Sequence, residues 1–109
     1  MENFRLDIFI VFALLGKNDN FKNGYSLTRA LHWKFGMLND LAVKEEMIKA
    51  GLITKNNTSS MNVYDITPMG RRFLANTFEK GKSSAYNDFP DEEEFLNAFF
   101  DGFVLPSEA

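Results

Sequence analysis

The periodicity of apolar residues changes once along this chain, and that change restricts the folds the chain can adopt. Before Gly51, apolar residues recur at three- and four-residue steps, which is typical of amphipathic helices. After it, Leu52–Thr54 and Val63–Thr67 are typical of short strands, with the polar stretch Lys55–Asn62 between them. Pro68 then favours a new helix capped by the preceding threonine, because proline at the first helical position loses no needed hydrogen bond. The sequence therefore predicts a hairpin between an upstream helical pair and a following helix.

The first predicted helix is apolar on almost every side. It runs to Leu15, with Asn3 placed to cap it and Gly16 placed to end it. Such a helix lies in the middle of a fold or at a dimer seam, because no face of it suits water. The polar stretch Lys17–Tyr25 then predicts a loop.

A second, short helix is predicted after that loop. Ser26 is placed to cap it and Gly36 to end it, with an apolar stripe at Leu27, Leu31 and Phe35. Its neighbouring His32 and Trp33 are expected to pack as partly buried aromatic side chains.

A third helix is predicted over residues 40–50, with Asn39 as its cap and Gly51 just after its end. Its core face is expected to hold the apolar residues Leu38, Leu41, Met47 and Ile48. Its solvent face is expected to carry the charged residues Asp40, Glu45, Glu46 and Lys49.

Beyond the hairpin the sequence predicts a division into a body and a tail. Residues 1–80 are expected to form the main domain, the Gly- and Ser-containing residues 81–90 a linker, and residues 91–109 an acidic, Phe-rich C-terminal helix or tail. A helix so apolar must dock on the body or on a second copy. We expect a homodimer whose interface, or whose contact with another partner, uses apolar side chains of the first and last helices: Phe9, Phe12, Phe95, Leu96, Phe99, Phe100 and Phe103.

Charge is distributed unevenly along the chain. All 12 Lys and Arg residues lie at or before Lys82, whereas residues 87–109 hold seven of the 15 acidic residues. A basic body therefore precedes an acidic tail. Such a tail either solubilises the chain end or imitates a polyanion.

Composition excludes several function classes. The chain has no cysteine and a single histidine, which argues against disulfides, a metal centre and a cysteine nucleophile. No catalytic constellation or phosphate-binding loop is present, so we expect neither an enzyme nor a cofactor. The longest apolar run, Ile8–Leu15, is far shorter than the roughly 20 residues that cross a bilayer. We find no targeting segment, and we expect a cytoplasmic protein without a membrane partner.

Two strings flank the predicted hairpin tip: AGLI at Ala50–Ile53 and YDITPMGRRFL at Tyr64–Leu74. They resemble the second half of bacterial winged-helix regulators of the phenolic-acid-repressor and multiple-antibiotic-resistance-regulator types. The resemblance covers about residues 26–78. It implies a mainly α fold with a small β-hairpin, the winged helix-turn-helix order α-α-α-β-β-α, followed here by the C-terminal helix.

The resemblance also implies a transcriptional regulator that binds double-stranded DNA, with the third helix in the major groove and the hairpin, or wing, on the backbone or in the minor groove. The residues that match these roles are Ser26, Thr28 and Arg29 on the second helix, Asn39, Val43 and Lys44 on the third, and Lys55, Asn56, Asn57 and Asn62 on the wing.

Acidic residues support an alternative function. The third helix carries Asp40, Glu45 and Glu46, and the isoelectric point is about 5.1, whereas DNA-binding surfaces are basic. The alternative is a non-catalytic winged helix that binds a protein through the wing, the third helix or the acidic tail. A phage-encoded inhibitor or a DNA-mimicking protein would act in this way.

Overall fold

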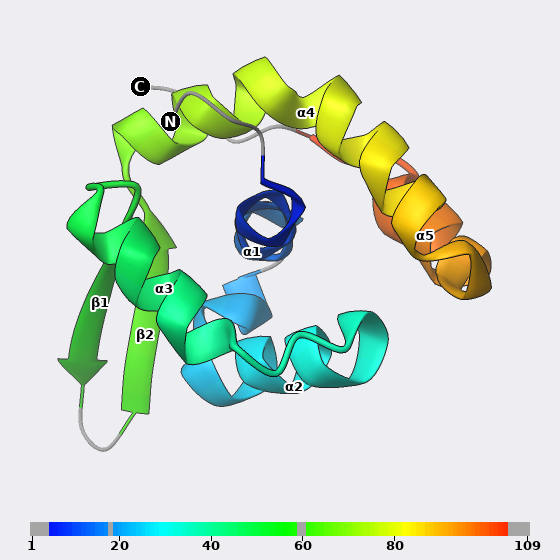
Figure 1. Cartoon of the computed structure of the whole chain (residues 1–109). Coiled ribbons are helices and arrows are strands. Elements are labelled where there is room, and N and C mark those ends of the chain that lie inside the picture. Colours follow the sequence, from blue (N-terminus) through cyan, green and yellow to red (C-terminus); the bar gives the residue numbers. More distant parts are fainter. Residues whose placement is uncertain (1–4, 18, 59–60, 105–109) are drawn as a thin grey trace.

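The computed structural model describes residues 5–17, 19–58 and 61–104 (Figure 1). Its elements are, in order, α1 (Leu6–Lys17), the 3₁₀ turn η1 (Asp19–Lys22), α2 (Gly24–Phe35), α3 (Asp40–Lys49), β1 (Ile53–Thr58), β2 (Met61–Ile66), α4 (Pro68–Asp88), the 3₁₀ turn η2 (Pro90–Glu92) and α5 (Glu93–Phe100). The described residues are mainly helical with a two-stranded antiparallel sheet, as expected. No helix among them is long and apolar enough to cross a membrane.

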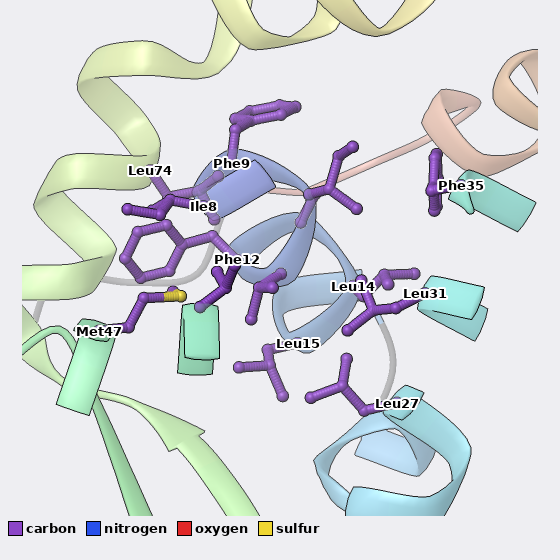
Figure 2. Close-up of a cluster of buried hydrophobic side chains, with 14 of the residues drawn as sticks. Ile8, Phe9, Phe12, Leu14, Leu15, Leu27, Leu31, Phe35, Met47 and Leu74 are labelled. Atoms are coloured by element: carbon purple, nitrogen blue, oxygen red, sulfur yellow. The ribbon is translucent and has the colours of Figure 1, made fainter. Parts of the chain in front are cut away.

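Helix α1 lies at the centre, and the other helices surround it (Figure 1). Every side chain from Ile8 to Leu15 is buried. These side chains radiate toward Leu74 of α4, Met47 of α3, and Leu27 and Leu31 of α2 (Figure 2). Burying each large apolar side chain stabilises the fold by about 1.5–3 kcal/mol, so the buried side chains of α1 contribute strongly to its stability. The expectation that α1 lies in the middle of the fold is confirmed.

The connection after α1 is shorter than expected. The helix continues through Gly16 to Lys17, and the predicted loop contains the turn η1. Gly16 does not end the helix as predicted; it lies in the last turn of α1 and has helical geometry. Asn3, the expected cap, lies outside the described residues.

Helix α2 begins earlier than predicted because Asn23, rather than Ser26, caps it. The Asn23 Oδ1 atom accepts hydrogen bonds from the backbone N–H groups of Tyr25 (2.9 Å) and Ser26 (3.3 Å). At the other end, Gly36 has φ 62° and its N–H donates to the His32 carbonyl, so its predicted role is confirmed.

The β-hairpin is longer than predicted. Ile53 pairs with Ile66, and the ladder continues to Thr58 opposite Met61, so most of the expected polar tip is paired strand. The polar side chains of this stretch favoured a loop prediction. Strand pairing uses backbone hydrogen bonds, however, and polar residues form these as well as apolar ones do. An isolated bridge between Asn23 and Val63 also ties the start of α2 to β2.

The start of α4 follows the sequence prediction. Thr67 is the N-cap, and its Oγ1 accepts a hydrogen bond of 3.1 Å from the Gly70 N–H, while Pro68 occupies the first turn. The same hydroxyl lies 2.7 Å from the Gly51 carbonyl oxygen. Thr67 therefore joins the start of α4 to the residue that follows α3.

We predict that Thr67→Ala lowers the free energy of unfolding by about 0.5–2 kcal/mol, because it removes the cap and leaves an N–H without its partner. Urea unfolding of the purified variant measures the loss. Thr67→Ser keeps the hydroxyl and should recover most of the stability. Equal losses in the two variants would contradict a capping role.

Helix α4 does not end where the linker was predicted. It runs without a break to Asp88, so residues 81–88 are helical. Gly81 is buried where α4 crosses α1, and a Cβ atom there would overlap the ring of Phe9. The glycine that suggested a linker instead permits close helix packing.

The C-terminal helix packs on its own chain. Leu96, Phe99 and Phe100 are buried, and the Phe100 ring meets the Phe78 ring of α4 edge to face at 5.8 Å between centroids. Phe95 and Phe103 are half-buried. Of the residues expected at an interface, Phe9, Phe12 and Leu96 are fully buried inside the chain, so that expectation is wrong for them. The homodimer itself stays a prediction.

Candidate functional site

The orientation of α3 differs from the sequence prediction. Val43 and Lys44, expected to contact DNA, are 1% and 2% exposed. Asp40, expected in solvent, is also buried, whereas Leu38 and Leu41 are 79% and 69% exposed. The helix is therefore rotated relative to the prediction: it buries Asp40 and Lys44 and exposes Leu41, and the turn before it exposes Leu38.

A buried polar network explains this rotation. Lys44 Nζ lies 2.9 Å from Asp40 Oδ2 and donates to Thr28 Oγ1 at 2.8 Å. His32 Nε2 lies 2.7 Å from Asp40 Oδ1, which is hydrogen-bond distance. The ammonium also lies 5.1 Å from the centroid of the Tyr64 ring. Because both buried charges have partners, the network fixes α3 against α2 and β2 without leaving a charge uncompensated.

The network changes the acidity of Asp40. Burial, the largest single effect, raises the pKa of this carboxyl, but hydrogen bonds from Lys44 and His32 outweigh it and hold the pKa below the ordinary 3.8. The folded state thus binds protons less readily than the unfolded state. The stabilisation is complete above the ordinary pKa and is lost as the pH falls through the lower, folded-state value.

We predict that acidification below about pH 4 destabilises the wild-type protein more than it destabilises Asp40→Asn. Asparagine cannot titrate, so the variant lacks this part of the pH dependence. Urea midpoints measured from neutral pH to the acid limit test the difference. Parallel curves for the two proteins would contradict a depressed pKa at Asp40.

The outward face of α3 is poorly suited to a nucleic acid. Its exposed residues are Leu41, Ala42, Glu45, Glu46 and Lys49. The Glu46 carboxylate forms an ion pair with Arg5, and Glu45 lies beside it in sequence. A surface that binds phosphates needs an excess of cations, which this face does not have.

The other predicted DNA contacts divide into three groups. Thr28 is committed to the buried network, and Ser26 is half-buried at the cap of α2. Asn57 lies in β1, but its side chain falls outside the described residues. The remaining members of the predicted set are exposed: Arg29, Asn39, Lys55, Asn56 and Asn62.

A ridge of exposed side chains follows α2 at four-residue steps. Tyr25 and Trp33 are 70% and 74% exposed, and the Arg29 guanidinium lies between them. Its Cζ atom is 5.6 Å from the centroid of the Tyr25 ring and 4.3 Å from that of the Trp33 ring. The expectation that Trp33 is partly buried is therefore wrong. The spacing Tyr25, Arg29, Trp33 is the signal that could have revealed this ridge, because it lies away from the buried stripe of the same helix.

The ridge continues toward α3. A hollow of about 320 Å³ separates the start of α2 from α3 and β2, and Tyr25 and Leu41 both line it, with Lys44 and Tyr64 also in its lining. Leu38 lies three residues before Leu41 in the turn that precedes α3. We call the exposed set Tyr25, Arg29, Trp33, Leu38 and Leu41 the α2–α3 face; both helices are visible in Figure 1.

Comparison with known proteins found no relative of this chain. No protein-family model matches the chain, and neither a curated protein sequence nor a solved structure matches it significantly.

Proposed function

We propose that this chain is a non-catalytic winged helix-turn-helix module that binds another protein through its α2–α3 face. The observation that carries the proposal is the exposure of Leu38, in the turn before α3, and of Leu41, in its first turn, while Val43 and Lys44 are buried. Support for the winged-helix form comes from the order of helices, hairpin and helix. The first turn of the helix that would enter a DNA groove, together with the turn before it, therefore presents two large apolar side chains outward.

The composition of the α2–α3 face suits a protein partner. Tyr, Trp and Arg are enriched where interfaces derive most of their binding energy. Single exposed apolar residues are ordinary on protein surfaces, but here Tyr25 and Trp33 lie on either side of Arg29 on α2. Leu41 shares a hollow with Tyr25, and the exposed Leu38 lies in the turn before α3. Covering them would remove apolar surface from water, which favours association.

Affinity capture with matched variants tests this proposal. The wild-type chain, Leu38→Glu/Leu41→Glu and Val104→Glu are immobilised separately, since Val104 is an equally exposed apolar residue outside the face. We expect a partner that wild type and Val104→Glu retain and that the double variant loses. Equal capture by all three proteins would exclude the α2–α3 face as the binding surface.

Double-stranded DNA binding is the second candidate, favoured by exposed residues near the hairpin. Lys49 at the end of α3 and Lys55 on β1 are exposed cations, and Asn56 and Asn62 are exposed hydrogen-bonding side chains on the two strands. These exposed groups can reach a DNA backbone, whereas Val43 and Lys44 are buried and cannot.

An electrophoretic shift assay with genomic fragments at low salt separates the two candidates. DNA binding requires a shift that weakens steeply as salt rises and that Lys49→Ala/Lys55→Ala reduces, because each phosphate contact releases counterions. The docking proposal expects no such shift at micromolar protein. A strong, salt-sensitive shift that depends on the two lysines would make DNA binding the better explanation.

A further inference from the structure

A second surface feature adjoins the ridge on α2, on the side away from α3. It is an open groove of about 320 Å³ between η1, α2 and α5. That volume is at the lower end of the roughly 300–1,000 Å³ typical of ligand pockets, so the groove can hold one or two side chains of a bound polypeptide segment. Its main lining residues are aromatic or cationic: Phe21, Tyr25, Arg29, Trp33, Lys34 and Phe95.

The charges at this groove have one sign. Arg29 and Lys34 line it, and no carboxylate does among the residues that the structure describes. Arg29 stacks on the rings of Tyr25 and Trp33, and Lys34 Nζ lies 5.1 Å from the centroid of the Phe95 ring. Within the described part of the chain, neither cation forms an ion pair. Both cations are exposed and oriented by aromatic rings, so each can receive a carboxylate.

The spacing of the two cations further restricts the occupant. Arg29 and Lys34 are five residues apart on one helix, which corresponds to about 7.5 Å along its axis. The two positions also differ by about 140° around the helix, so a segment that reaches both cations must carry its two acidic residues on either side of an intervening residue. The aromatic rings that also line the groove then offer an apolar site for the side chain between those two acids.

We infer that the α2 groove binds an acidic, amphipathic segment of a partner protein, in which Asp or Glu residues flank an aromatic or branched apolar side chain. The inference rests on the proposed function and names the chemistry of the partner. The apolar side chain packs on Trp33 and Phe95, while the carboxylates pair with Arg29 and Lys34. An aromatic patch alone or a pair of cations alone is common on protein surfaces, and the combination of the two gives the specificity.

Selection from a random peptide library displayed on phage tests the inference directly. The folded full-length chain is the bait, and Arg29→Glu/Lys34→Glu is the counter-selection bait; all three lining positions used here, Arg29, Trp33 and Lys34, are exposed, so their variants should fold. We expect enriched peptides in which acidic residues flank an apolar one. Enrichment without an acidic excess, equal enrichment on both baits, or no enrichment would overturn the inference.

Fluorescence polarisation of one enriched peptide then gives the magnitude. We expect Trp33→Ala and Arg29→Glu/Lys34→Glu each to weaken binding about thirtyfold or more, as loss of a central interface residue does. Binding should also weaken with salt. Competition by an unrelated single-stranded oligonucleotide as effective as that by the free peptide would overturn the inference, because it would reveal a general polyanion site.

Two further measurements keep the outcomes distinct. Leu38→Glu/Leu41→Glu should bind the peptide normally, because these residues do not line the groove. If that double variant loses capture of a partner while no acidic peptide is selected, the proposed function stands and the inference fails. A concentration-dependent dimer in solution that Arg29→Glu/Lys34→Glu abolishes would also overturn it, since the occupant would then be a second copy.

Discussion

Replacing Lys44 with alanine is expected to lower the free energy of unfolding by about 3–5 kcal/mol, the cost of leaving one member of a buried ion pair without its partner. Asp40 is 3% exposed, and it would lose the ammonium 2.9 Å from its Oδ2 atom. Thr28 would also lose the hydrogen bond that its hydroxyl accepts from Lys44. Chemical denaturation at neutral pH measures the loss.

The paired replacement provides the control. Asp40→Leu/Lys44→Leu removes both charges and fills the site with apolar side chains, so it should range from neutral to about 4 kcal/mol more stable than wild type. The two single losses would then be strongly non-additive. A cost for Lys44→Ala below about 1 kcal/mol, the range of exposed ion pairs, would show that Lys44 is solvated and that α3 is not rotated as described.

Gly81→Ala is expected to destabilise the protein by about 1–3 kcal/mol, the cost of forcing extra atoms into a packed core. The added methyl group would overlap the ring of Phe9, which is fully buried beneath α4. Without that contact, alanine inside a helix would stabilise it by about 0.5–1 kcal/mol relative to glycine. The sign of the effect therefore reports on the contact between α1 and α4, and thermal unfolding measures it.

Two variants check the origin of this effect. Ser83→Ala lies on the exposed side of the same helix and should be neutral or slightly stabilising. Phe9→Leu should destabilise alone but reduce the additional cost of Gly81→Ala, because it shortens the group that the new methyl meets. Stabilisation by Gly81→Ala would mean that residues 81–88 are separated from α1, as a linker would be.

Local signals in the sequence predicted the hairpin and several helix ends, but not the end of α1, the cap of α2 or the helical residues 81–88. The hairpin lies where the periodicity changes, Thr67 caps α4 next to Pro68, and Gly36 and Gly51 have positive φ values at the predicted helix ends. Each of these features depends on residues within a few positions of one another. Backbone geometry and local hydrogen bonds are sufficient to specify them.

The candidate site was predicted less well, because it depends on which face of a helix is buried. Hydropathy alone favoured burial of Leu41 and exposure of Asp40 and Lys44. The opposite arrangement is possible only because Thr28 and His32 of α2 satisfy the charged pair, and these residues lie 12 and eight positions from Asp40. No pattern within α3 alone contains that information.

The amino-acid sequence by itself determined the end of α2 at Gly36, the start of α4 at Pro68 and the burial of the apolar helix α1. Tertiary structure alone decided that α3 buries its ion pair. It also decided that α4 continues through Gly81, which packs against Phe9, and that the Phe-rich face of α5 packs on α4 of the same chain. The physical reason is range: dihedral preferences and caps act between neighbours, whereas burial and charge compensation depend on groups supplied by distant segments.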